Sequence, residues 1–354
     1  MNEVSATDED MGRDFYRALV LRRQAILVGL LLALALSLCI DLALGPARYS
    51  LGEVVEALLW PSSVDDQRRV IVWEIRMPIA LMAVIVGASL SIAGAQMQTI
   101  LNNPLASPFT LGISAGAGFG AALALAFGVA LFPFAAAYII PVNAFIMAML
   151  TSLAIYGLSL RRSVTSETIV LLGIALVFIF NALMSLIQFF ASEQAVAAVV
   201  FWTMGSLTKA TWAKVWVSLA ALAISAPLLA RRGWALTAMR LGDAKAESMG
   251  IRLRPLRLEV LVIVSLLASI SVAFVGTIGF IGLVGPHIAR MLLGEDQRFL
   301  LPGAALCGAL ILSIGSILSK MIIPGTVIPI GIVTAIVGIP FFLYLILNRR
   351  AQTW

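Results

Sequence analysis

The chain has 354 residues, of which 61% are hydrophobic and 12% are charged, and its formal net charge is +6. A soluble core of this size does not need so many apolar residues, so the composition excludes an ordinary soluble protein. The apolar runs are roughly twenty residues long and do not alternate with polar residues as barrel strands do, which predicts an all-α polytopic membrane protein.

Polar segments at the two ends of the sequence flank one long apolar region. Residues 1–24 are polar and mixed in charge, and the apolar run that follows Arg22 and Arg23 has no small-residue cleavage site after it. This pattern favours a retained first span over a signal peptide. We therefore expect a cytoplasmic N-terminal segment over 1–24, one transmembrane domain over 25–348 and a cytoplasmic tail over 349–354.

Recurring apolar stretches predict about ten membrane-spanning helices. The expected ranges are 25–45, 74–100, 109–130, 137–160, 168–190, 213–230, 258–276, 278–293, 299–322 and 328–348. An even number of spans places both termini on one side of the membrane. If that side is the cytoplasm, only seven of the 24 Lys and Arg residues lie outside, as expected when cationic loops stay in the cytoplasm. These seven are Arg48, Arg68, Arg69, Arg76, Lys209, Lys214 and Lys320.

The second and third spans carry signals for turns and close packing. The stretch NNPLASP (102–108) predicts a turn after the second span, since Pro104 and Pro108 cannot continue a helix. The third span contains Gly112, Gly116, Gly118 and Gly120. Small residues let helices approach closely, so we expect these glycines to serve packing, with a flexible pathway as the alternative.

The fifth span carries a polar stripe. Asn181, Met184, Ser185 and Gln188 recur three or four residues apart on one helical face. Such a stripe on an apolar helix is expected to face protein or water rather than lipid.

The most polar internal stretch is RLGDAKAESMGIRLRPLR (240–257). Asp243 can cap a short helix there, and Gly250 is a stop signal. One side of this helix would present Leu241, Ala244, Ser248 and Met249 to a groove on a soluble partner. The alternative is a solvated basic loop that serves only topology.

Several kinds of chemistry are missing from the sequence. None of the lysines follows a glycine, so a P-loop for ATP cannot form. The carboxylates nearest to spans lie at or near span ends, which disfavours a secondary carrier with a deep proton relay. These carboxylates are Asp41, Glu74, Glu167, Glu193 and Glu259.

Metal and redox sites are equally unsupported. His287 is the only histidine, and we expect it to be structural; Cys39 and Cys307 lie inside apolar spans. We therefore predict no catalytic residue, no metal site and no cofactor bound by this chain. What remains is a pathway whose energy must come from a partner.

Four ordered stretches resemble the FecCD-type permeases, the membrane subunits of ABC importers for ferric siderophores, haem and cobalamin. They are RMPIALMAVIVGASLSIAGAQMQTILNNPLASPFTLGISAGAG (76–118), LGDAKAESMGI (241–251), GTIGFIGLVGPHIAR (276–290) and IPIGIVTAIVGIPFF (328–342). The resemblance implies the type II importer architecture, with ten helices in each of two permease subunits. The implied partners are a second permease subunit, two cytoplasmic ATPases that bind ATP and Mg, and a periplasmic binding protein. The implied location is the bacterial inner membrane.

The resemblance also implies roles for individual residues. In the family a loop, here within 231–257, docks on the ATPase, which assigns coupling contacts to Leu241, Gly242, Asp243, Ala246, Glu247, Met249 and Gly250. Binding-protein docking is carried over to Arg76 and Lys320, while Ile79 stands where relatives have a second arginine. The cations Arg68, Arg69, Lys209 and Lys214 lie on the same predicted face and could compensate.

The pathway in the family runs between the fifth and tenth spans of the two subunits. On this basis Asn181, Met184, Ser185 and Gln188 are interpreted as pathway residues, with ordinary hydrogen bonding between helices as the alternative. The cytoplasmic gate is predicted at Thr165, Ser166 and Glu167. A ferric siderophore is the expected cargo because it is the family's commonest; haem or cobalamin are the alternatives, and a gradient-driven secondary carrier is the alternative of another class. Whether the permease pairs with itself or with a sister chain stays open.

Overall fold

The computed structural model describes the backbone of residues 2–45, 47, 49–132, 138–159, 166–323 and 325–347. Within these ranges every regular element is a helix, which confirms the predicted all-α class. The order is α1 (Asn2–Ala43), α2 (Leu51–Leu59), α3 (Asp66–Arg69), the π-helix η1 (Val70–Arg76), α4 (Met77–Ile100), α5 (Ile113–Phe127), α6 (Ile139–Ser159), α7 (Ser166–Phe190), α8 (Glu193–Thr203), α9 (Trp212–Arg231), α10 (Gly233–Met239), α11 (Asp243–Ser248), α12 (Leu253–Val275), α13 (Ile281–Leu293), α14 (Gln297–Met321) and α15 (Ile330–Leu347).

The predicted spans correspond to helices one by one. In the part of the chain that the structure describes, seven helical stretches are long and apolar enough to cross a membrane: α1, the continuous run from α3 through η1 to α4, α6, α7, α9, α12 and α14. Shorter apolar helices are α5, α13 and the Ile330–Leu343 part of α15. Each of these ten overlaps one predicted range, so the expectation of about ten spans is confirmed.

Among the described residues, α2, α8 and α10 were not predicted, and α3 and η1 begin before the predicted start of the second span at residue 74. α2 begins with a capping box in which the Ser50 side chain accepts from the Glu53 backbone, and Glu53 accepts from Ser50. α8 starts at a similar cap, where the Ser192 hydroxyl accepts from the Ala195 backbone N–H. α10 follows α9 almost without a break, at Arg232. These helices were missed because each is too short to show an apolar run of spanning length.

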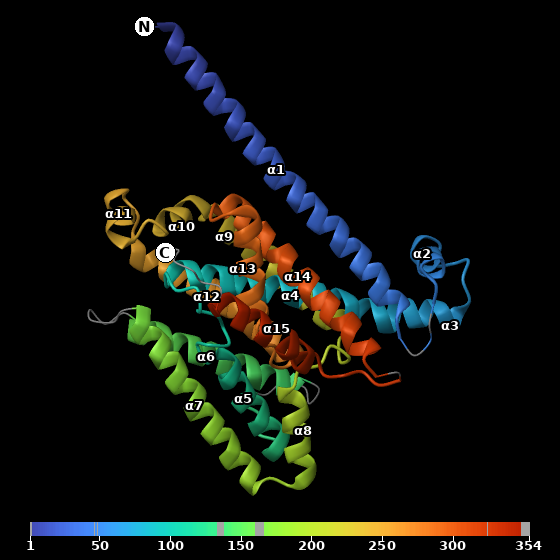
Figure 1. Cartoon of the computed structure of the whole chain (residues 1–354). Helices are drawn as coiled ribbons and strands as arrows, with labels where there is room; N and C mark the ends of the chain where they lie inside the picture. The colour runs from blue at the N-terminus through green and yellow to red at the C-terminus, as the bar shows by residue number, and fades with distance from the viewer. Residues whose placement is uncertain are drawn as a thin grey trace.

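α4 is the central helix of the bundle and packs against α14, α13, α12 and α9 (Figure 1). Glycines make this packing possible. A Cβ added at Gly94 would overlap the carbonyl of Gly282 in α13, and one added at Gly87 would overlap the carbonyl of Gly308 in α14. Only a residue without a side chain permits so close an approach of backbones.

α5, α6, α7 and α8 form a second group beside this core (Figure 1). Gly120 lies against the backbone of Asn143 in α6, and Gly116 lies against Thr151. A Cβ at Gly173 of α7 would come within 2.7 Å of the Cα of Leu111, which lies just before α5. The packing interpretation is therefore confirmed for Gly116 and Gly120.

The turn predicted at 102–108 is confirmed. α4 ends at Ile100, and Asn102 follows with a left-handed φ of 44°. The Asn103 side chain accepts from the Leu105 backbone at 2.9 Å, and the Ser107 backbone donates to the Thr110 hydroxyl at 2.9 Å. Side chains thus satisfy backbone groups that the prolines prevent from joining a helix.

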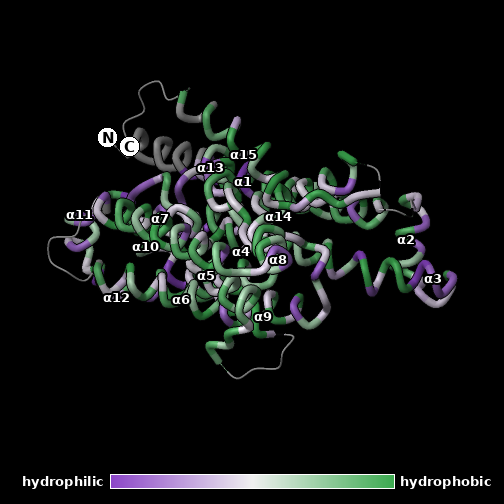
Figure 2. The backbone as a smooth tube through the Cα atoms, turned by 90° about the horizontal axis from the view of Figure 1, so that it is seen from below, coloured by the Kyte–Doolittle hydropathy of each residue, from purple (hydrophilic) through white to green (hydrophobic). Residues whose placement is uncertain are grey.

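The two ends of the bundle are polar. α10 and α11 lie at one end, and α2 and α3 lie at the opposite end (Figures 1 and 2). Hydrophilic residues gather at both ends, whereas the middle is mostly hydrophobic (Figure 2). The N-terminal part of α1 extends past the bundle, towards the end that carries α10 and α11 (Figure 1).

Candidate functional site

The polar stretch at 240–257 forms a short exposed helix between two turns. α10 ends at Met239, Gly242 adopts φ +96°, and α11 runs from Asp243 to Ser248. Gly250, with φ +82°, ends the segment before α12 begins at Leu253. The predicted short helix and its glycine stop are confirmed. We call residues 233–250, which comprise α10, α11 and their turns, the coupling segment.

Asp243 does not cap this helix as predicted. The N-cap residue is Gly242, and no side chain caps α11. The Asp243 carboxylate instead accepts two hydrogen bonds of 2.9 Å from the Arg257 guanidinium, which also donates to the Ile100 carbonyl at 3.1 Å. A charge-assisted pair with an arginine outcompetes a local cap, and it ties α11 to α12 and to the end of α4.

Most of the predicted coupling residues are accessible, with one exception. Leu241 is 57% exposed and Met249 is 46% exposed, while Asp243, Glu247 and Gly250 are exposed and Gly242 is half-buried. Ala246 is fully buried in the hydrophobic core, so its side chain is not exposed as those of most other predicted contact residues are. The Ala246 methyl group packs α11 against the bundle, and the opposite side of this helix faces outwards.

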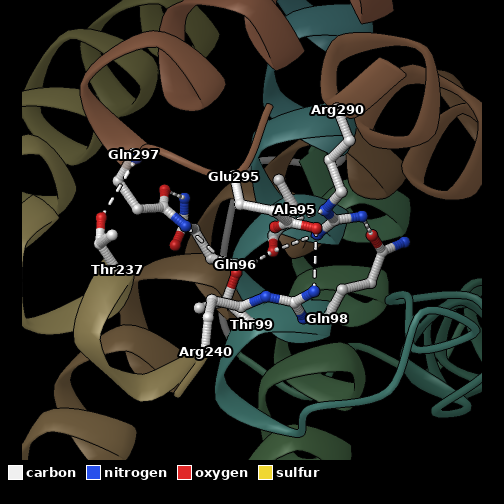
Figure 3. Close-up of polar contacts among 9 residues, drawn as sticks. All are labelled: Ala95, Gln96, Gln98, Thr99, Thr237, Arg240, Arg290, Glu295 and Gln297. Atoms are coloured by element: carbon white, nitrogen blue, oxygen red, sulfur yellow. Dashed lines mark hydrogen bonds and ion pairs between the residues drawn. The ribbon is translucent and has the colours of Figure 1, made fainter. Parts of the chain in front are cut away.

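A buried polar cluster fixes the coupling segment to the bundle (Figure 3). Glu295, in the turn between α13 and α14, accepts from Arg240 at 2.9 Å and from Arg290 at 3.3 Å. Arg290 in turn donates to the side chain of Gln98 and, at 3.5 Å, to the Ala95 carbonyl of α4. The turn after α10 is thereby joined to α13 and α4.

A second connection runs from α10 to the first residue of α14 (Figure 3). The Gln297 backbone donates to the Thr237 hydroxyl at 3.2 Å. The Gln297 side chain accepts from Gln96 at 2.9 Å and donates to Thr99 at 3.2 Å. Both glutamines are at most 3% exposed, so these bonds are made away from water.

Sequence reasoning missed this cluster. The signal was the stretch Gln96-Met97-Gln98-Thr99, where two amides lie one turn before the end of an otherwise apolar span. Polar groups at such a depth need partners, which here come from residues about two hundred positions away. Next to the cluster, hydrogen bonding from Arg298 holds the pKa of Asp296 below its ordinary value.

Arg76, which was carried over as a docking residue, is buried within the chain. It is 5% exposed and donates to the Leu42 carbonyl at 2.7 Å, to the Ala43 carbonyl at 3.1 Å and to the Ala47 carbonyl. Its guanidinium also lies over the Tyr49 ring, 4.9 Å from the centroid. The arginine satisfies carbonyls at the end of α1, where the helix leaves them without intrahelical partners.

Lys320, the second residue carried over for docking, is likewise largely buried within the chain. Its ammonium lies 2.9 Å from the Asp41 carboxylate, and the two side chains are 9% and 0% exposed. The hydroxyl of Ser316 donates to the same carboxylate at 3.0 Å. The pair joins α1 to α14 and leaves no charge for a partner.

The compensating cations differ in their availability. Arg68 lies within 3.2–3.5 Å of Glu53, Glu56 and Asp65, so its charge is neutralised within α2 and α3. Arg69 pairs with Asp66 in an exposed bridge of 2.8 Å. Lys209 is exposed, and half-buried Lys214 donates to its carbonyl at 2.7 Å.

The polar stripe on α7 is partly exposed. Asn181 and Ser185 are exposed and Gln188 is half-buried, whereas Met184 packs against the small cluster of Ala122, Ile187 and Val199. α7 packs mainly against α5 and α6 and presents the rest of its surface outwards. Of the predicted gate residues, Thr165 lies outside the described residues, Ser166 is the first residue of α7, and Glu167 is exposed.

An open cavity of about 580 Å³ lies beside α15. Its lining includes Thr203, Thr277, Phe280 and Ile336, which come from α8, the turn before α13, and α15. Irregular backbone borders it, where Ser206 donates to the Val275 carbonyl at 2.7 Å and Gly331 donates to the Met204 carbonyl at 3.0 Å. Non-helical backbone at membrane depth is tolerated where it is buried or lines a water-filled cavity.

Metal ligation finds no support in the geometry. Among the residues described, no three His, Cys, Asp or Glu side chains form a group that could hold a metal ion. His287 is half-buried and lies edge-on to the Phe341 ring, with 6.3 Å between centroids.

Comparison with known proteins places this geometry in context. Residues 30–348 match the FecCD transport family. The hemin transport system permease protein HmuU of Yersinia pestis is 36% identical over 323 residues, which cover 91% of this chain and 97% of that protein. The vitamin B12 import system permease protein BtuC of Yersinia enterocolitica is 35% identical over 331 residues, covering 93% of this chain and 95% of that protein. A solved metal-chelate type ABC transporter in an inward-facing conformation is similar with a TM-score of 0.80 and 30% identity, covering 92% of this chain and 99% of the other.

Proposed function

Because the chain belongs to the FecCD transport family, we propose that it imports a ferric siderophore by alternating access, driven by ATP hydrolysis on partner subunits. The general function, without the identity of the cargo, follows from membership of this family. The chain is a permease of an ABC importer for an iron chelate, haem or cobalamin, and it is not an enzyme. The gradient-driven carrier considered from the sequence is thereby set aside.

The observation that carries the mechanism is the exposed and anchored coupling segment. Leu241 and Met249 are large apolar side chains that lie open to solvent at a polar end of the bundle. Large apolar groups in such positions are typical of a docking helix that enters a groove on a partner. We propose that the cytoplasmic ATPase binds here, with Gly242, Asp243, Glu247 and Gly250 at the rim of the contact.

We expect Leu241→Asp and Met249→Asp to weaken binding of the partner ATPase by at least about tenfold, because each places a charge in an apolar contact. Both side chains are exposed, so the folded permease should form in normal amounts. Co-purification with the ATPase would measure the effect. Leu59→Asp is the matched control, since Leu59 is 62% exposed but lies on α2 at the opposite end. Equal effects of all three substitutions would count against the assignment.

The proposed pathway lies between two copies of the chain. α7 presents exposed Asn181 and Ser185, and α15 borders the open cavity. A second permease, most simply an identical one, would cover both helices and enclose a polar route that includes Gln188. The cytoplasmic gate is proposed at Thr165, Ser166 and Glu167, at the start of α7.

The proposed orientation places both termini and the coupling segment in the cytoplasm of a bacterial inner membrane. α2 and α3 then face the periplasmic binding protein, together with the loop that carries Lys209. With Arg76 and Lys320 buried, the candidates for this docking are Arg68, Arg69, Lys209 and Lys214. Arg69 and Lys209 are the most accessible of them.

The cargo is tested by uptake under iron limitation. Cells with and without the chain would be offered radiolabelled ferric siderophores, haem and cobalamin in parallel. We expect loss of ferric siderophore uptake alone when the chain is absent. Loss of haem or cobalamin uptake instead would replace the proposed cargo and leave the importer function in place.

A further inference from the structure

Glu295 holds together two arginines from different parts of the chain. Arg240 belongs to the coupling segment, and Arg290 belongs to the last turn of α13. Glu295 itself lies in the three-residue turn that leads from α13 to α14, and each of its carboxylate oxygens accepts from one arginine (Figure 3). One carboxylate thus connects the coupling segment with the end of α13 and the start of α14.

Both arginines of this connection are largely buried. The Arg290 side chain is 7% exposed and the Arg240 side chain is 15% exposed, compared with 39% for Glu295. Arg290 continues the chain of contacts to Gln98, which is 1% exposed in α4. Charged hydrogen bonds with little access to water are stronger and better oriented than exposed ones.

The helices that receive this connection form one packed unit. α4 contacts α13 through Gly94 and Gly282, and contacts α14 through Gly87 and Gly308. A displacement of Arg240 is therefore passed to helices that cannot slide apart without losing close backbone contacts. The second connection, from Thr237 to Gln297, runs in parallel to the same unit.

A comparable ion pair at this end of the molecule has a similarly exposed carboxylate but a much more exposed arginine. Arg232 and Glu259 join the turn before α10 to α12 at 2.8 Å, and hydrogen bonding to Glu259 raises the Arg232 pKa. Their side chains are 51% and 35% exposed, and the pair does not reach α4, α13 or α14. Exposed pairs of this kind contribute little to stability.

We propose that Glu295 is a positioning residue that makes the coupling segment move together with α4, α13 and α14, so that ATP hydrolysis on the partner is converted into opening of the pathway. The inference rests on the proposed function. Its active element is the bridge from Arg240 through Glu295 to Arg290. Without the bridge, the ATPase would still bind at α11 and still hydrolyse ATP. The resulting movement of the coupling segment would, however, displace α4, α13 and α14 less.

The test uses the full transporter, reconstituted in proteoliposomes with its ATPase and binding protein. The readout is the amount of cargo imported per ATP hydrolysed. We expect Glu295→Gln and Arg240→Gln each to lower this ratio about 5- to 10-fold, at the lower end of the usual coupling between sites. The double variant should lose no more than either single one, because both remove the same bridge. Glu295→Asp retains the charge and should keep most of the ratio.

Glu259→Gln is the matched control, since it removes one carboxylate of an ion pair at the same end and should leave the ratio unchanged. A purely structural role of Glu295 would lower the amount of assembled transporter and leave the ratio of the assembled fraction intact, which would overturn the proposal. It would equally be overturned if neither Glu295→Gln nor Arg240→Gln assembled with the ATPase. An absence of ATP-dependent import by the unsubstituted transporter would instead contradict the proposed function.

Discussion

Replacement of Lys320 by methionine is expected to lower the free energy of unfolding by about 3–5 kcal/mol, because it leaves the Asp41 carboxylate buried without a counter-charge. Asp41 is fully buried, and its carboxylate also accepts a hydrogen bond from the hydroxyl of Ser316. Thermal or denaturant unfolding of the purified permease in detergent micelles would measure the loss. A substantial loss would also confirm that Lys320 serves the fold and not a partner.

Two controls make this prediction specific. The double variant Asp41→Leu with Lys320→Met should recover most of the stability, since an apolar pair of similar volume needs no desolvated charges. Arg69→Ala breaks the exposed pair with Asp66 and should change stability by at most about 1 kcal/mol. If Lys320→Met unfolded like the unsubstituted chain and instead weakened binding-protein association, Lys320 would be a docking residue after all.

The fate of the predicted cations shows what sequence alone can establish. Hydropathy and loop charge were sufficient for the ten spans, since the length and polarity of a span follow from the bilayer itself. Hydropathy and loop charge did not distinguish Arg76 and Lys320 from exposed cations. Both residues lie next to span ends, where the sequence does not show whether a long cationic side chain reaches out to water or is buried. Their partners, the last carbonyls of α1 and Asp41, become visible only when α1 is packed against α4 and α14.

In the coupling segment, too, local features could be predicted from the sequence but contacts between distant residues could not. A short helix that ends before a glycine stop was predictable because such a stop is a local signal, whereas the predicted cap by Asp243 was not found. The partner of Asp243 was not predictable, since Arg257 competes with the local backbone for the carboxylate. Glu295, Gln297 and the amides of α4 were invisible for a further reason: their contacts join residues far apart in the chain.

Gly94→Ala is expected to destabilise the permease by about 3 kcal/mol, although alanine is the better helix former. Gly94 lies in the interior of α4, and an added methyl group would overlap the Gly282 carbonyl of α13, which is backbone and cannot rotate away. The two helices must move apart, and the packing that joins α4 to α13 is lost. Unfolding in detergent would measure the effect, with transport as a second readout.

Gly29→Ala in α1 is the matched control for this effect. No atom lies within 4 Å of the position that its Cβ would occupy. Helix propensity then acts alone and should leave stability unchanged or raise it by about 1 kcal/mol. The two substitutions make the same chemical change in two apolar helices, so an opposite sign of their effects isolates the close approach of α4 to α13. A similar, small effect at both positions would mean that the bundle accommodates a methyl group there and that the helices in the packed unit can separate at little cost.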